Sequence, residues 1–196
     1  GTAIAIGLVA GLGFAMKPYY LAIPAAVELY LLIRRGWRAT FIDQIPWSIG
    51  AVAVAHLVSM YTIFSAFGNF VLPLAIESYE PIGDQGWRQV LLGNVMAPTL
   101  LALLIFGAFA VFLTQTMAAR ALLAFGIGAA LSAIGQAKGW PYHVLPALAT
   151  AILLATFTLS QTVDRYLPIS RSSHRLPVAI ISATLMVLLY FQAALY

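Results

Sequence analysis

The sequence contains no cysteine among its 196 residues. This absence excludes a disulfide framework, a thiolate nucleophile and a metal site with cysteine ligands. The chain also lacks the G-x-S-x-G motif of serine hydrolases and the H-E-x-x-H motif of zinc metalloproteases. A retinal protein is excluded too, because the last apolar segment carries no lysine for a Schiff base.

Charged residues are scarce as well. They make up 8% of the chain, whereas hydrophobic residues make up 62%. A soluble domain carries about 25% charged residues, because polar groups must cover its core. The same apolar excess excludes an intrinsically disordered chain. With a mean hydropathy of +0.95, the chain is expected to be an integral membrane protein.

Seven apolar segments predict the fold class. They cover residues 2–16, 19–33, 46–67, 90–113, 121–135, 144–161 and 178–195. A straight transmembrane helix needs about 20 apolar residues, so the short first, second and fifth segments are expected to be tilted, partial or broken. The first two could also form one long helix broken at Pro18. The predicted fold is all-α: a polytopic transmembrane helical bundle of about seven spans, some short or broken.

We expect one transmembrane domain over residues 1–196, and part of a longer or processed protein, because the chain begins and ends within apolar runs. The basic residues predict its orientation. With a cytoplasmic N-terminus and alternating segments, the inner gaps hold Arg34, Arg35, Arg38, Arg120, Arg165, Arg171 and Arg175, and the outer gaps hold Lys17, Arg88 and Lys138. This division follows the positive-inside rule. It accounts for the net charge of +4, and no nucleic-acid partner is predicted.

The longest gap between apolar segments covers residues 68–89 and contains Glu77, Glu80, Asp84 and Arg88. A loop of this length is typical of a lid over a site or of a solvated linker. Its three carboxylates suit contact with an acceptor substrate or a divalent cation. The alternative is that they are solvated acids at the membrane surface. No resident metal site is predicted, and a divalent cation is the only cofactor considered.

The second outer gap, residues 136–143, is dense in functional side chains. Lys138 offers a cation, Trp140 and Tyr142 offer flat rings, and His143 can titrate or donate a hydrogen bond. A cation beside rings suits a phosphate attached to a sugar, and the alternative is an interfacial anchor with a snorkelling lysine. Lys17, next to a helix start at Pro18, suits an anion or reaches the outer headgroups.

Polar and small residues inside the segments have mostly structural interpretations. His56 is interpreted as a packing residue, and Glu28 is expected to pair with Arg35 on the same helix face. Helix packing explains the small residues Gly7, Gly11, Gly126, Gly128 and Ser132. The loop at residues 171–175 sets topology and can touch anionic lipid.

The opening stretch IAIGLVAGLGFAMKPYYLAIPAAVELYLLIRRGWR resembles a recurrent segment of the integral-membrane C-type glycosyltransferases. That group includes protein O-mannosyltransferases and aminoarabinose transferases of lipid A. The matching positions are Gly7, Gly11, Gly13, Lys17, Pro18, Arg34 and Arg35, and the turn QAKGWPYHVLPA is similar to a segment before a late span in bacterial members. The resemblance covers about 50 residues well, and the remainder only as alternating helices.

The resemblance implies an enzyme of the bacterial inner (plasma) membrane. It would move a sugar from a polyprenyl-phosphate carrier to an acceptor on the outer face, so its partners are the lipid bilayer and the carrier-linked sugar. Such enzymes place an essential carboxylate in a first outer loop, which would precede residue 1, so the catalytic base remains unassigned. We expect Lys17, Arg88, Lys138 and His143 to hold the departing phosphate of an inverting transfer.

Two other functions remain open at this point. A transporter or flippase subunit for lipid or polysaccharide would have a cavity at mid-depth near His56, with Lys17 as a counter-ion of the substrate. In a glycosyltransferase, an amphipathic outer cavity would open sideways to lipid, and Lys17, Lys138 and His143 would converge on it. A structural scaffold would have neither of these cavities.

Overall fold

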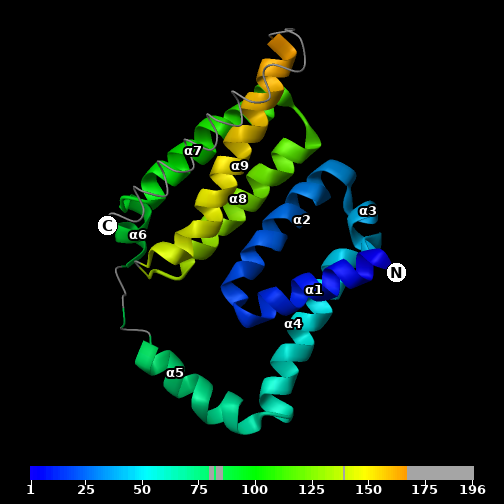
Figure 1. Cartoon of the computed structure of the whole chain (residues 1–196). Helices are drawn as coiled ribbons and strands as arrows, with labels where there is room; N and C mark the ends of the chain where they lie inside the picture. The colour runs from blue at the N-terminus through cyan, green and yellow to red at the C-terminus, as the bar shows by residue number, and fades with distance from the viewer. Residues whose placement is uncertain (80–81, 83–85, 139, 167–196) are drawn as a thin grey trace.

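The computed structural model describes residues 1–79, 82, 86–138 and 140–166. Within this part the chain is helical and contains no β-strand (Figure 1). The elements are α1 (Thr2–Met16), η1 (Pro18–Leu21), α2 (Ala22–Arg35), α3 (Trp37–Ile42), α4 (Gln44–Thr62), η2 (Phe67–Val71), α5 (Leu72–Tyr79), α6 (Gly86–Leu92), α7 (Met96–Ala108), η3 (Phe109–Thr114), α8 (Met117–Gly135) and α9 (Pro141–Tyr166). The all-α prediction is confirmed for the described residues. The predicted segment 178–195 and the loop 171–175 lie outside them.

Four described helices are long and apolar enough to cross a membrane. They are Gln44–Thr62, Met96–Thr114, Met117–Gly135 and Tyr142–Thr162. The helix Thr2–Met16 is apolar but shorter. Many large hydrophobic side chains on these helices are exposed, such as Leu104 and Phe112, which are both 71% exposed. Exposed apolar surface on this scale is compatible with contact to a lipid bilayer, and the helices are consistent with a multi-pass membrane protein.

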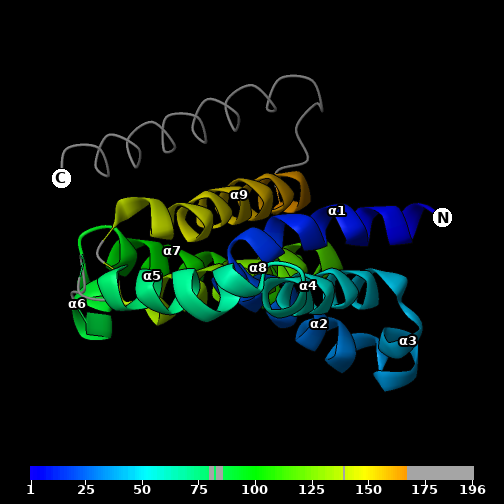
Figure 2. The ribbon, with the colours of Figure 1, turned by 90° about the horizontal axis from the view of Figure 1, so that it is seen from below.

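The helices form two packing units. In the first, α8 packs against α9, α2 and α7, and its buried core includes Met96, Leu103 and Leu154. In the second, α1 packs along α4 (Figures 1 and 2). The segment α5 projects away from both units (Figure 1), and in the described part its main contacts are with η2.

Small residues permit the closest helix contacts, as the sequence predicts. A Cβ atom added to Gly7 would lie 2.6 Å from the Cβ of Ser48 in α4. One added to Gly128 would lie 2.5 Å from the carbonyl oxygen of Ala22 in α2. These glycines therefore set the distances between α1 and α4 and between α2 and α8.

Two helix ends also match the sequence. The helix α1 ends at Met16, directly before Lys17 and Pro18, and Pro18 occupies the first turn of η1, where a missing N–H costs nothing. The helix α2 ends at Arg35, directly before Gly36, whose φ of 81° lies in the left-handed region that favours glycine. The chain turns sharply at both places.

Two predictions from the sequence are wrong. The gap at residues 68–89 is not one long loop, because η2, α5 and α6 occupy most of it. Pro73 does not prevent this, since it lies near the start of α5, where a helix tolerates proline.

Glu28 also does not pair with Arg35. Its Oε2 atom is buried without a hydrogen-bond partner in the described part of the chain. Instead, the turn at Gly36 brings Asp43 to Arg35, with 3.4 Å between Nη1 and Oδ2. The carboxylate that pairs with Arg35 therefore belongs to Asp43, which follows the chain reversal, and not to Glu28 on the same helix.

Candidate functional site

Both lysines of the chain lie in turns at one end of the first packing unit. Lys17 and Lys138 are the only lysines in the sequence. Lys17 directly precedes η1, which packs against α8, and Lys138 follows α8 in the turn before α9. The Nζ atom of Lys17 lies 5.1 Å from the centre of the Tyr142 ring and 5.8 Å from that of Tyr20. We call Lys17, Tyr20, Lys138, Trp140, Tyr142 and His143 the lysine–aromatic cluster.

Two turns position this cluster. Lys17 follows α1, and η1, which it precedes, packs against α8. The turn after α8 includes Ala137 with a φ of 51°, and α9 starts a few residues later. The backbone N–H of His143 donates to the carbonyl oxygen of Trp140 at 3.0 Å. The packing of α2 on α8 therefore brings together two turns that lie far apart in the sequence (Figure 1).

The rings of the cluster form a compact group. Trp140 and Tyr142 stack at 5.6 Å with 28° between their planes. Tyr142 and His143 meet edge to face, with 4.3 Å between their ring centres and 80° between their planes. The ring centre of Trp140 also lies 5.4 Å from that of His143. Aromatic pairs in these arrangements attract each other beyond simple burial, so the rings hold one another in place.

Exposure differs across the cluster. Lys17 is exposed and the Tyr142 side chain is 43% exposed, whereas His143 is only 5% exposed. The Nδ1 atom of His143 is buried and has no hydrogen-bond partner among the described residues. A buried ring nitrogen without a partner is unfavourable. The cluster thus combines an exposed cation, Lys17, with a buried imidazole that has one unsatisfied nitrogen.

The other residues singled out in the sequence do not join the cluster. Arg88 lies over the ring of its neighbour Trp87, with 5.3 Å between Cζ and the ring centre, and forms no ion pair with the described residues. Glu77 is exposed on α5, away from the bundle (Figure 1). Glu80 and Asp84 lie outside the described residues. The described part contains no group of three side chains suited to hold a metal ion.

The cluster also contains a residue that the sequence did not single out as a binding residue. Tyr20 supplies the second ring near Lys17. Its position three residues after Lys17, one turn of the short helix η1, is the signal that could have identified it.

The opposite end of α2 and α8 carries arginines, and these contact groups of the protein. Arg35 pairs with Asp43, and Arg120 donates from Nη2 to the carbonyl oxygen of Val111 at 3.0 Å. Arg38 lies over the ring of Trp37 at 5.2 Å. This end therefore resembles a set of anchored charges more than a binding site.

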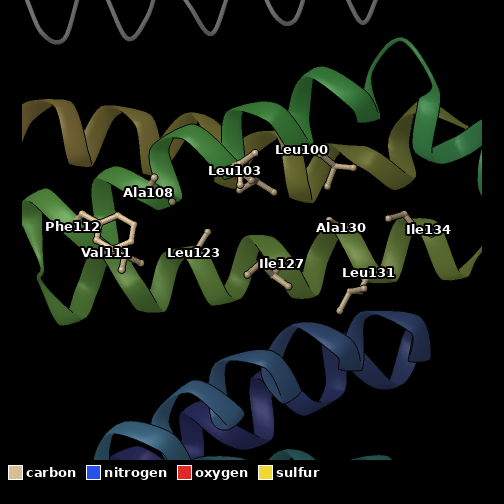
Figure 3. A pocket seen from close by; sticks show the side chains of 12 residues that line it. Leu100, Leu103, Ala108, Val111, Phe112, Leu123, Ile127, Ala130, Leu131 and Ile134 are labelled. Atoms are coloured by element: carbon tan, nitrogen blue, oxygen red, sulfur yellow. The ribbon is translucent and has the colours of Figure 1, made fainter.

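A groove of about 490 Å³ lies between α7 and the facing side of α8 (Figure 3). The residues that line it are all apolar, and they include Leu103, Leu123 and Ile134. No residue of the lysine–aromatic cluster lines this groove, nor does His56. The groove is thus a lipid-like surface, without the polar groups that a midplane transport site would need.

Comparison of the chain with protein-family models, with curated proteins and with solved structures finds no match.

Proposed function

We propose that the protein is a membrane glycosyltransferase that moves a sugar from a polyprenyl-phosphate carrier to an acceptor on the outer face of the membrane. The observation that carries this proposal is that the Tyr142 ring contacts both the Lys17 ammonium and the His143 imidazole, directly after the turn that holds Lys138. The donor of such a reaction has an anionic phosphate joined to a sugar, and both parts lie at headgroup level. Cations and flat rings at one end of a helical bundle match these two parts.

The chemistry of the transfer defines what the cluster does. An oxygen or nitrogen of the acceptor attacks the anomeric carbon, the bond from that carbon to the phosphate oxygen breaks, and the electron pair leaves with the polyprenyl phosphate. Negative charge therefore grows on the phosphate as the reaction proceeds. Lys17 and Lys138 stabilise this charge. Preorganised cations contribute most to catalysis where charge develops in the transition state. The acceptor gives its proton to a general base as it attacks.

The aromatic residues have a different role in the proposal. Tyr142 and Trp140 offer apolar ring surface for the C–H face of the sugar, while their polar atoms remain at the interface. Because Tyr142 contacts both Lys17 and His143, it places the sugar next to the phosphate contacts. Glu77 and Arg88 are not needed for this arrangement.

The proposal includes an arrangement in the membrane. The protein would lie in a bacterial inner membrane with about seven spans and a cytoplasmic N-terminus, so the lysine–aromatic cluster faces outward. The four long apolar helices support membrane residence. The arginines at the opposite end of α2 and α8 fit a cytoplasmic side, because positively charged residues accumulate there.

The test is sugar transfer by the full-length natural protein in vesicles, with a panel of polyprenyl-phosphate hexoses and pentoses and cell-envelope lipids as acceptors. We expect Lys138→Ala and His143→Ala to lower the transfer rate by at least about tenfold, which corresponds to about 1.4 kcal/mol of transition-state stabilisation. Arg34→Ala, at the opposite end, is the matched control and should retain transfer. Near-normal rates in both cluster variants would refute this assignment. Movement of the intact donor across the vesicle without transfer would indicate a transporter.

A further inference from the structure

The lysine–aromatic cluster concentrates positive charge in a chain that has very little charge. Its two lysines are the only ones in the sequence, and Lys17 forms no ion pair with the described residues. The exposed Lys17 ammonium lies against the rings of Tyr142 and Tyr20, which attract a cation without neutralising it. An anion can therefore bind Lys17 without displacing a carboxylate.

His143 gives an independent indication of a ligand. It is 5% exposed, and its Nδ1 atom has no hydrogen-bond partner in the described part of the chain. The Tyr142 ring contacts both the imidazole and the Lys17 ammonium, so the residue with the unsatisfied nitrogen and the cation share one aromatic neighbour. A ligand with several oxygen atoms can satisfy the nitrogen and the ammonium groups together.

We infer that the cluster binds a lipid-borne phosphomonoester more tightly than a phosphodiester. This inference rests on the proposed function, in which the sugar-bearing donor is a diester and the departing polyprenyl phosphate is a monoester. A monoester carries about −1.5 to −2 charges at neutral pH and has three terminal oxygens, whereas a diester carries one charge and has two. Lys17, Lys138 and His143 offer contacts for three oxygens, so the monoester matches them better.

This preference has a consequence for the reaction. Interactions that are stronger with the departing group than with the donor accelerate the step in which charge develops. The same interactions retain the product, so the free lipid monophosphate should compete with the donor. The cluster would thus determine both the rate of the transfer and its inhibition by the product.

The experiment uses the full-length protein in nanodiscs of phosphatidylcholine that contain either phosphatidic acid, a monoester, or phosphatidylglycerol, a diester. Brief acetylation followed by mass spectrometry reports on each lysine separately, because the sequence has only two. We expect phosphatidic acid to protect Lys17 and Lys138 at a mole fraction about tenfold lower than phosphatidylglycerol. Equal protection by the two lipids would overturn the inference. Protection by inorganic phosphate alone would support the monoester chemistry and assign it to a soluble ligand.

Variants of His143 test its part in the preference. His143→Phe should reduce the tenfold preference to less than about twofold, because the ring nitrogen is lost. His143→Gln keeps a polar group, should keep part of the preference, and replaces the Phe variant if that one fails to fold. The matched control is His56→Gln on α4, which should leave the preference unchanged. A full preference in both His143 variants would remove His143 from the site.

These measurements separate the inference from the proposed function, because they do not involve sugar transfer. A protein that prefers phosphatidic acid but transfers no sugar would refute the glycosyltransferase proposal and keep the phosphomonoester site. A protein that transfers sugar without this lipid preference would keep the function and refute the inference.

Discussion

The two ends of the α2–α8 pair hold their cations in different ways. At one end Arg35 pairs with Asp43, and Arg120 donates to the carbonyl oxygen of Val111. At the other end Lys17 lies over the rings of Tyr142 and Tyr20 and forms no ion pair with the described residues. Arg35 and Arg120 thus contact oxygen atoms of the protein, whereas Lys17 contacts aromatic rings.

The chemistry of the two side chains explains why this difference matters. A guanidinium group that already contacts fixed acceptors has fewer donors left for a ligand. An ammonium group that rests on ring faces keeps its three N–H donors, and the ring stabilises its position without neutralising it. Similar positive charge therefore yields an anchor at one end of the bundle and a candidate anion site at the other.

The largest effect is expected from a change that separates α2 from α8. Gly128→Ala would place a Cβ atom 2.5 Å from the carbonyl oxygen of Ala22, so the helices must move apart. We expect a loss of about 1–3 kcal/mol of stability, as is usual for overpacking, and faster acetylation of Lys17 because η1 shifts. Thermal unfolding in detergent and lysine acetylation measure these effects.

The control for this prediction is Gly13→Ala. No atom lies within 4 Å of a Cβ atom added at Gly13, so this variant should be neutral or gain up to about 1 kcal/mol from helix propensity. Equal stability of the two variants would mean that the contact at Gly128 does not hold the cluster in place.

A smaller effect is expected from the ring that supports Lys17. Tyr142→Ala removes the ring that lies 5.1 Å from the lysine ammonium and should cost about 0.5–1 kcal/mol at such an exposed site. It should also weaken phosphatidic acid protection of Lys17, because the ammonium is no longer positioned. Tyr142→Phe keeps the ring and should behave like the natural protein. If both variants lose protection, the hydroxyl group and not the ring is responsible.

Much of the helical pattern could be predicted from the sequence. Apolar runs long enough to bury the backbone in lipid can form only helices, and the predicted segments coincide with α1, α4, α8 and α9 within a few residues. Pro18 and Gly36 end or begin helices where their backbone preferences require it. The helical elements η2, α5 and α6, which occupy most of the predicted loop at 68–89, were missed because their apolar runs are short and interrupted by Pro73 and Pro81.

The candidate site was predictable only in part. Lys138, Trp140, Tyr142 and His143 are conspicuous because they crowd one short gap. That Lys17 joins them, and Arg88 does not, depends on which helices pack together. The helix α8 packs most extensively against α9 and α2, and α1 packs against α4. These partners are distant in the sequence, so local sequence does not specify the pairing. The Asp43 partner of Arg35 likewise depends on a chain reversal and not on helix periodicity.

The smallest effect is expected at the arginine end. Asp43→Asn removes the ion pair with Arg35, in which the Arg35 side chain is 41% exposed and the Asp43 side chain 23% exposed. The variant keeps an oxygen that can accept a hydrogen bond from the backbone N–H of Ile45 at the start of α4. Exposed ion pairs contribute less than about 1 kcal/mol, so a small drop in unfolding temperature is expected. Asp43→Ala also removes the cap, which costs about 1 kcal/mol more. Neither variant should change the acetylation of Lys17 or its protection by phosphatidic acid, because the contacts of Asp43 and those of Lys17 involve different residues. A change in lysine protection would show instead that α2 couples its two ends, and the arginines would then be part of the site.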